Sequence, residues 1–173
     1  MIVPLTAISG KLQNEYESVQ GASWEGSPFA WIIRRRSSRQ RGKIGEELVT
    51  EWCKENGLRV ERCPDSDADC LIEGKRVEIK FSTLWEGGSY RFQQLRDQNY
   101  DYLLCLGVSP FTVHAWIMKK SEIPFDMLKH QHKGKQGLDT WWFSVTPGKE
   151  PEWLKQHGGT LEDVLTVLKT LHA

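Results

Sequence analysis

Apolar residues recur at helical spacing in two parts of the chain. The first part begins at Lys43 and ends at the stop signal Asn56-Gly57, and its apolar positions are Ile44, Leu48, Val49, Trp52 and Cys53. The second follows Thr160, a favourable N-cap, and its apolar positions are Leu161, Val164, Leu165, Leu168 and Leu171. The segment RFQQLRDQ at 91–98 is also predicted to be helical.

Six other segments have the pattern of β-strands. Short runs at 58–63 and 69–73 precede a longer one at 75–83, and Glu73-Gly74 is a plausible two-residue hairpin turn between the last two. The nearly continuous apolar run YDYLLCLGV at 100–108 is typical of a strand covered on both faces, and VHAWIM and DTWWFSV follow it. The order of these elements predicts an α/β fold with a mixed central sheet flanked by helices.

Composition narrows the class of protein. The 173 residues, 20.0 kDa, fit one domain over 1–173, with a core at about 41–120 to which an N-terminal arm and a C-terminal helix are appended. No long apolar run and no cationic leader pattern occurs, so we expect a cytoplasmic protein without membrane segments. The four cysteines lack the spacing of a zinc site, and we expect them to be small core residues.

The predicted hairpin gathers charged residues on one face. With Glu73 and Gly74 in the turn, Asp69 lies directly across from Glu78, and Lys80 shares the face of Glu78. The other face carries Val77, Ile79, Phe81, Cys70 and Ile72. Opposed carboxylates repel each other, so either this is the solvated face of an ordinary hairpin or a cation lies between them. Mg²⁺, with Mn²⁺ able to substitute, suits such a pair together with waters and phosphate oxygens, and Lys80 would stand beside a metal-bound water.

The arrangement Asp69-x8-Glu78-x-Lys80 resembles the PD-(D/E)xK nuclease superfamily, which includes type II restriction endonucleases, Holliday-junction resolvases and repair nucleases. The stretch from Arg41 to Glu46 is similar to the basic-Gly-x-x-x-Glu signature that begins a helix ahead of the hairpin in archaeal resolvases. This resemblance covers roughly residues 41–108. It implies a restriction-endonuclease-like fold, catalytic roles for Glu46, Asp69, Glu78 and Lys80, and metal coordination by Asp69, Glu78 and Glu46.

Alternatives exist for two of these acids. Glu46 falls at the edge of the apolar arc of its helix, whereas the neighbouring Glu47 points away from it, so we prefer Glu46. In the hairpin, Asp65 precedes the strand, and Asp67 lies two residues beyond the position that faces Glu78. Asp69 is therefore the preferred hairpin acid.

Candidate DNA contacts come from basic and amide side chains. The formal net charge is zero, so local clusters must supply any attraction to a polyanion. One basic run leads into the Glu46 helix and contains Arg34, Arg35, Arg36, Arg39, Arg41 and Lys43. A second, at 129–137, contains Lys133 and Lys135, and its glutamines Gln131 and Gln136 could read adenine edges. Ser82 lies next on the face of Lys80, and the resemblance implies a glutamine near the site, Gln93 or Gln94.

Other aromatic segments have two interpretations each. The loop at 85–90 could enter a DNA groove or be an ordinary connection, and the cluster Trp141-Trp142-Phe143 is interpreted as packing rather than as a base-stacking surface.

Three functions fit these residues. The preferred one is a Mg²⁺-dependent endonuclease acting on double-stranded DNA, most like a sequence-specific type II restriction enzyme that cuts as a homodimer. A structure-specific nuclease of the junction-resolvase or repair type uses the same chemistry. A non-catalytic nucleic-acid-binding module is the third, although two carboxylates facing a polyanion would not help a protein that merely binds.

Overall fold

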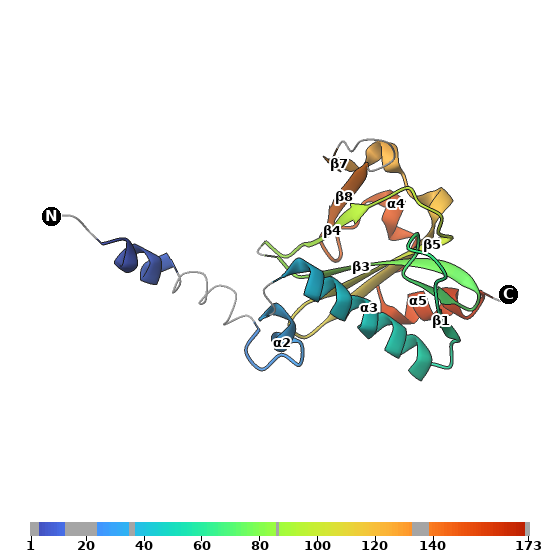
Figure 1. The fold of residues 1–173 in the computed structure, drawn as a ribbon, viewed down its shortest axis with the longest axis horizontal. Coiled ribbons are helices and arrows are strands. Elements are labelled where there is room, and N and C mark those ends of the chain that lie inside the picture. The colour runs from blue at the N-terminus through green and yellow to red at the C-terminus, as the bar shows by residue number, and fades with distance from the viewer. Residues whose placement is uncertain (1–3, 13–23, 35–36, 86, 133–138, 172–173) are drawn as a thin grey trace.

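A five-stranded mixed sheet lies at the centre of the computed structural model, which describes residues 4–12, 24–34, 37–85, 87–132 and 139–171 (Figure 1). Its strands, in spatial order, are β1 (Val60–Arg62), β2 (Cys70–Ile72), β3 (Lys75–Thr83), β5 (Tyr102–Val108) and β6 (Val113–Lys119). Strands β3 and β5 are parallel, and the other neighbours are antiparallel. The predicted mixed α/β class is confirmed.

The hairpin of β2 and β3 has the predicted register. Ile72 pairs with Lys75 and Cys70 pairs with Val77, which leaves Glu73 and Gly74 in the turn. Their φ angles are 49° and 79°, and a two-residue type I′ turn requires positive φ at both positions. Glycine at the second position takes this conformation without a steric penalty.

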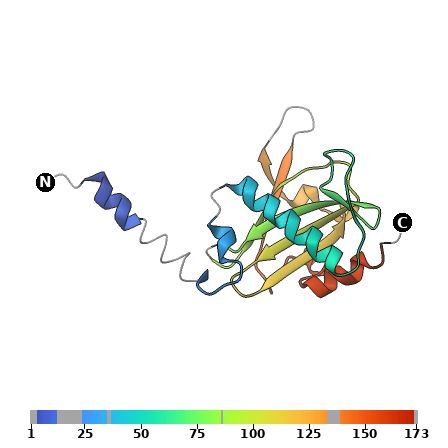
Figure 2. The same ribbon diagram turned by 60° about the horizontal axis from the view of Figure 1, so that its bottom comes forward.

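Two helices cover one face of the central sheet. Helix α3 (Ser38–Glu55) lies across this face (Figure 2). It begins five residues before the predicted Lys43, because the Ser37 side chain accepts a hydrogen bond from the Gln40 backbone N–H and caps the helix there. Helix α5 (Leu161–Leu168) packs on β6, and a capping box between Thr160 and Asp163 starts it as the sequence predicts. The short helix α2 (Ala30–Ile33) precedes α3.

A close contact sets the distance between α3 and β3. A Cβ atom added at Gly45 would lie 2.3 Å from the Cβ and Cγ atoms of Phe81. Helix α3 therefore approaches β3 more closely than any other residue at this position would allow. Val49 and Cys53, farther along the same face of α3, are buried against the sheet.

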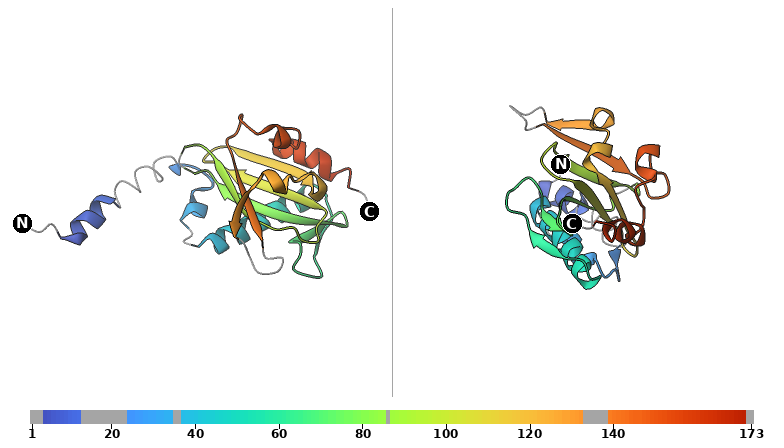
Figure 3. Two further views of the ribbon diagram at one scale, coloured as in Figure 1. Left: turned by 90° about the horizontal axis from the view of Figure 1, so that it is seen from above. Right: turned by 90° about the vertical axis from the view of Figure 1, so that its right-hand side faces the viewer.

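A second, three-stranded antiparallel sheet covers the opposite face, as Figure 3 shows. Its order is β4 (Tyr90–Leu95), β8 (Thr140–Val145) and β7 (Lys129–His132). Three short helical segments accompany it: η1 (Lys120–Glu122), η2 (Phe125–Met127) and α4 (Glu152–Lys155). Leu103, Cys105, Trp116 and Met118 fill the space between the two sheets.

The helix predicted at 91–98 is wrong, because residues 90–95 form strand β4. Tyr90 and Phe92 are fully buried, whereas Arg91 and Gln93 point to the other face, which is the alternation of a strand. An irregularity between Phe92 and Leu95, with Gln94 at a φ of 56°, then breaks the alternation. The segment is therefore a strand with a bulge rather than a helix. In the part of the chain that the structure describes, no helix is long and apolar enough to cross a membrane.

Candidate active site

The candidate site lies on the edge of β3, next to the residue that precedes β2 in the chain. Strand β2 pairs with residues 75–77 of β3, and the Asp69 backbone N–H donates to the Val77 carbonyl oxygen at 3.0 Å. The Asp69 carboxylate then accepts a hydrogen bond from the Ile79 backbone N–H at 2.6 Å. The Asp69 side chain therefore bonds the backbone of β3 one step beyond the last residue pair of β2 and β3. This hydrogen bond fixes the carboxylate at the edge of β3.

Glu78 lies across from Asp69, on the sheet face that looks toward β4. It is 9% exposed, and its Oε1 atom lies 3.6 Å from the Lys80 Nζ atom. Burial, followed by a hydrogen bond with Asp69, raises the pKa of Glu78 to about 8, and the Lys80 charge opposes this shift. A carboxyl group with this pKa is largely protonated at neutral pH in the absence of a cation.

Glu46 reaches the same carboxylate from helix α3. Burial raises the pKa of Glu46 to about 7, and both the charge of Asp69 and a hydrogen bond with it add to the shift. Lys43 and Lys80 act in the opposite direction. The carboxyl groups of Glu46 from helix α3 and Glu78 from strand β3 thus meet that of Asp69, which directly precedes β2, with Lys80 beside them.

The alternative acids lie elsewhere. Asp65 forms an ion pair with Arg76, and its Oδ1 atom also accepts a hydrogen bond from the Asp67 backbone N–H at 3.0 Å. Arg76 and these bonds hold Asp65 in the loop before β2. Glu47 is exposed, whereas Glu46 is partly buried. The structure brings Asp69, rather than Asp65, to the side chains of Glu46 and Glu78.

The donor chemistry of the site fits a hard divalent cation. Two of its three carboxyl groups have raised pKa values, first because they are buried and further because of the neighbouring Asp69, and a cation would favour their ionised forms. Among the described residues, no three or more His, Cys, Asp or Glu side chains form a ready-made metal cage. Mg²⁺ does not need one, since it is usually held by one or two carboxylates and completes its shell with waters and substrate oxygens.

The raised pKa of Glu78 predicts how stability depends on pH without divalent cations. Between pH 4.5, its ordinary value, and about 8, the folded protein keeps a proton that the unfolded chain releases, so stability falls as the pH rises. Glu78→Gln removes this loss, and we expect it to stabilise the protein at pH 8 by roughly 2 to 4 kcal/mol. Urea denaturation from pH 5 to 8 in a chelating buffer measures the effect.

Glu47→Gln is the matched control for this prediction. Glu47 lies next to Glu46 on helix α3 but is exposed, so the change should leave the pH profile of stability as in the wild type. A Glu78→Gln profile that declines as steeply as that of the wild type would contradict the assigned pKa shift.

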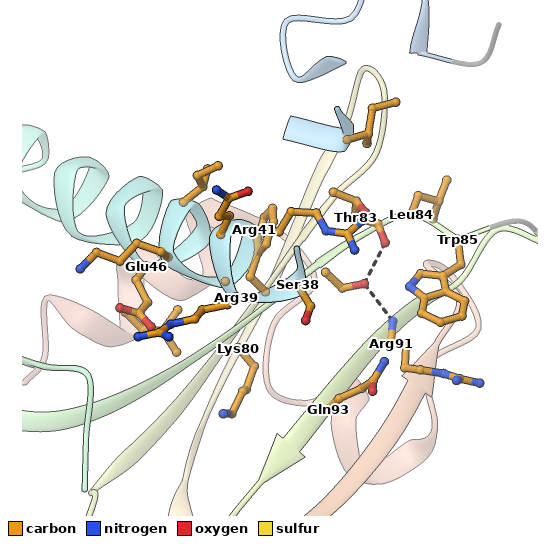
Figure 4. Close-up of a pocket in the computed structure, with 18 of the residues that line it drawn as sticks. Ser38, Arg39, Arg41, Glu46, Lys80, Thr83, Leu84, Trp85, Arg91 and Gln93 are labelled. Atoms are coloured by element: carbon orange, nitrogen blue, oxygen red, sulfur yellow. Dashed lines mark hydrogen bonds between the residues drawn. The ribbon is translucent and has the colours of Figure 1, made fainter. Parts of the chain in front are cut away.

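A large pocket of about 1720 Å³ adjoins the site (Figure 4). Glu46 and Lys80 line it, and the first turns of α3 add Arg39, Arg41 and Lys43. Arg34 is exposed at the end of α2, outside the lining of this pocket. Arg35, Arg36, Lys133 and Lys135, which the sequence also marks as candidate DNA contacts, lie outside the described residues.

The remaining predicted contacts lie on the other side of this pocket. Ser82 is 5% exposed, and its hydroxyl donates to the Thr83 carbonyl oxygen at 2.8 Å and accepts from the Arg91 backbone N–H at 3.0 Å (Figure 4). It thereby joins β3 to β4, and a phosphate would have to compete with these bonds. Gln93 and Gln94 also line the pocket, from strand β4 rather than from the predicted helix.

One further residue at this pocket, Arg91, was not recognised from the sequence. The Arg91 guanidinium carbon lies 4.5 Å from the ring centre of Trp85 and 4.3 Å from that of Trp142. Phe143 and Trp141 pack toward the core, as the sequence predicts, but Trp142 lies on the opposite face. The alternation Tyr90-Arg91-Phe92-Gln93 is the signal that would have placed Arg91 beside Gln93 on one strand face.

Comparison with known proteins identifies a solved structure of similar fold. A bacterial homing endonuclease, I-Ssp6803I, matches with a TM-score of 0.51 over 79% of this chain and 94% of that chain, at 13% sequence identity. No protein-family model and no curated protein sequence matches the chain. At this identity the similarity concerns the fold alone, and the chain therefore has a nuclease-like mixed α/β fold.

Proposed function

We propose that the protein is a metal-dependent DNA endonuclease of the PD-(D/E)xK type. The observation that carries the proposal is the meeting of Glu46, Asp69 and Glu78 beside Lys80, on the open edge of β3 and next to a pocket with a basic wall. The fold shared with a homing endonuclease supports the same class of activity.

Each side chain has a role in this proposal. Asp69 and Glu78 would hold Mg²⁺, with Glu46 completing the acidic cluster. The bound ion would supply Lewis acidity and balance the negative charge that develops on the phosphate. Lys80 would hold the attacking water as an ammonium donor or, as the neutral amine, take a proton from it, and its short distance to Glu78 keeps its Nζ atom at the site.

The basic wall would position the DNA backbone. Arg39, Arg41 and Lys43 lie along the first turns of α3, on the helix that also carries Glu46. Phosphate contacts from such residues fix the orientation of a duplex but carry no sequence information. Helix α3 would thus carry both Glu46 and the contacts to phosphates next to the scissile one.

We further propose that the enzyme is sequence-specific and acts as a homodimer. One site per chain cuts one strand, so two copies related by a two-fold axis would cut both strands of a palindrome. Helix α5 is an unsuitable interface, because its residues Val164 and Leu168, and Leu171 after it, are already buried within the chain.

Incubation with unmethylated DNA of mixed sequence tests the proposal. We expect fragments in Mg²⁺ or Mn²⁺ and none in EDTA, because removing the ion leaves the carboxyl groups without a partner for the phosphate. Sequencing the fragment ends distinguishes a sequence-specific restriction enzyme from a structure-specific nuclease. A common end sequence indicates a restriction enzyme, whereas cleavage confined to branched DNA indicates a structure-specific nuclease. Metal-independent binding without cleavage would contradict nuclease activity.

A further inference from the structure

The three-stranded sheet has one face that is not used for packing in the core. Tyr90, Phe92, Phe143 and Val145 on one face are buried between the sheets. The opposite face carries Arg91, Trp142 and Lys129, as the strand register requires, and also Gln93, which follows the buried Phe92 in the alternation of β4. Gln131 lies at an irregularity of β7, and its hydrogen bond with Gln93 places it on this face as well. This set of five residues is called the open face below.

The open face continues directly from the candidate active site. Arg91 and Gln93 line the same pocket as Glu46 and Lys80 (Figure 4). Among the described residues, neither Arg91 nor Lys129 forms an ion pair with a carboxylate. A duplex bound against the basic wall of α3 would therefore meet a cationic sheet surface next to the site.

Two glutamine side chains on this face are held in one orientation. The Gln94 backbone N–H donates to the Gln131 Oε1 atom at 2.8 Å, and a backbone N–H can donate to the oxygen end of an amide but not to its NH₂. The Gln131 Nε2 atom must then point toward Gln93, where it donates to Oε1 at 2.8 Å. Within the described residues, the Gln93 NH₂ group has no hydrogen-bond partner, and one lone pair of the adjacent oxygen is left to accept a bond.

The Gln93 amide of this pair presents a hydrogen-bond donor and an acceptor that are complementary to the edge of adenine. A glutamine amide binds adenine in the major groove by donating to N7 and accepting from the N6 amino group. A Gln93 amide that is already oriented would lose less conformational freedom on binding than a free one. The bulge at Gln94 supplies the backbone N–H that fixes the pair, which gives this irregularity of β4 a function.

Aromatic rings hold the neighbouring cation in place. Arg91 lies against Trp85 and Trp142, and the Lys129 Nζ atom lies 4.8 Å from the ring centre of Trp142. A guanidinium group stacked on rings keeps its in-plane N–H donors available. The rings position a charge beside the glutamine pair.

We propose that the open face lies in the major groove of double-stranded DNA and that Gln93, oriented by Gln131, selects an adenine in the recognition sequence. The major groove admits a two-stranded β-ribbon, so two of the three strands of this sheet would enter it. The inference deepens the proposed nuclease function and rests on it, because it names the residues that select the site rather than those that cut it.

Selection of binding sequences from a random pool of double-stranded DNA tests this inference. The Lys80→Ala protein serves as the parent, so that cleavage does not interfere with recovery. We expect one position enriched in adenine, and we expect Gln93→Leu to weaken that enrichment about tenfold or more. Gln131→Leu should weaken it as well, because the Gln93 amide is no longer held in one orientation.

Gln93→Glu separates base recognition from a structural role. The introduced carboxylate can still accept from Gln131 Nε2, so a merely structural Gln93 would leave the enriched sequence unchanged. A residue that reads the base should instead shift the preference toward cytosine, whose N4 amino group donates to carboxylates. Gln156→Leu, at an exposed glutamine after α4, is the control and should keep the parent sequence.

Two results would overturn the inference: an enriched sequence that is the same in the parent, Gln93→Leu and Gln93→Glu, or recovery of no common sequence. Neither result concerns cleavage, which is measured separately with wild-type protein and Mg²⁺. Cleavage without any effect at Gln93 would leave the nuclease proposal standing and reject this role of the open face. An adenine preference that is lost on substitution of Gln93, in a protein that never cleaves DNA, would support this role of the open face and reject the nuclease proposal.

Discussion

Lys80→Ala is expected to reduce the rate of DNA cleavage by about 10²- to 10⁴-fold, the contribution that positioned proton-transfer groups make. The side chain of Lys80 lines the pocket and lies 3.6 Å from Glu78, so its removal takes the ammonium group from the side chains that would hold the ion. Glu78→Ala should have the larger effect and abolish cleavage, because it removes one of the two proposed metal-holding carboxylates.

Both substitutions should leave the fold intact, because these side chains point away from the core between α3 and the sheet. Single-turnover cleavage rates in Mg²⁺ measure the effect, and urea denaturation verifies folding. Lys54→Ala is the matched control, since Lys54 pairs with Glu51 on the exposed side of α3 and should be dispensable. Wild-type rates in both Lys80→Ala and Glu78→Ala would reject the site.

Activity and stability are opposed at this site. The same Glu78 carboxyl whose removal should stop cleavage is expected to destabilise the folded protein at pH 8 when no cation is present. Burial and the neighbouring Asp69 make its ionised form unfavourable in the fold, and Lys80 offsets this in part. A structure without a function for Glu78 would gain from an apolar residue or an amide there.

Local sequence signals were sufficient to predict the hairpin and its acids. A two-residue turn at Glu73-Gly74 fixes the register of β2 and β3, and the alternation of side chains then places Asp69 across from Glu78. The angular position of Glu46 at the edge of the apolar arc of α3 is likewise a property of a single helix. These features depend on residues that are near each other in the chain.

Long-range packing decides the features that the sequence did not predict. Strand β4 pairs with β8, about fifty residues later in the chain, and that pairing overrides the helical spacing of RFQQLRDQ. The reach of Glu46 to Asp69 depends on the contact between Gly45 and Phe81, which brings α3 close to β3. The position of Arg91 between Trp85 and Trp142 likewise depends on a loop and a distant strand.

Ile79→Asp is expected to unfold the protein at neutral pH. Ile79 is 5% exposed and packs in the core between the central sheet and the helices α3 and α5, on the face of β3 opposite to Glu78 and Lys80. Leaving an unpaired charge there costs about 3 to 5 kcal/mol, to which the lost apolar packing adds. That sum is comparable to the total stability of a domain, about 5 to 15 kcal/mol.

Circular dichroism and urea denaturation at two pH values would show this effect and its cause. The buried carboxyl should have a pKa far above its ordinary value, so the folded state would gain stability relative to pH 7 as the pH falls toward 5. Ile79→Val is the control, with an expected loss of roughly 1 kcal/mol, because it removes one methylene group from the same place. A stable and active Ile79→Asp protein would show that the two faces of β3 are assigned the wrong way round, and the site would then have to be rebuilt on the face of Val77 and Phe81.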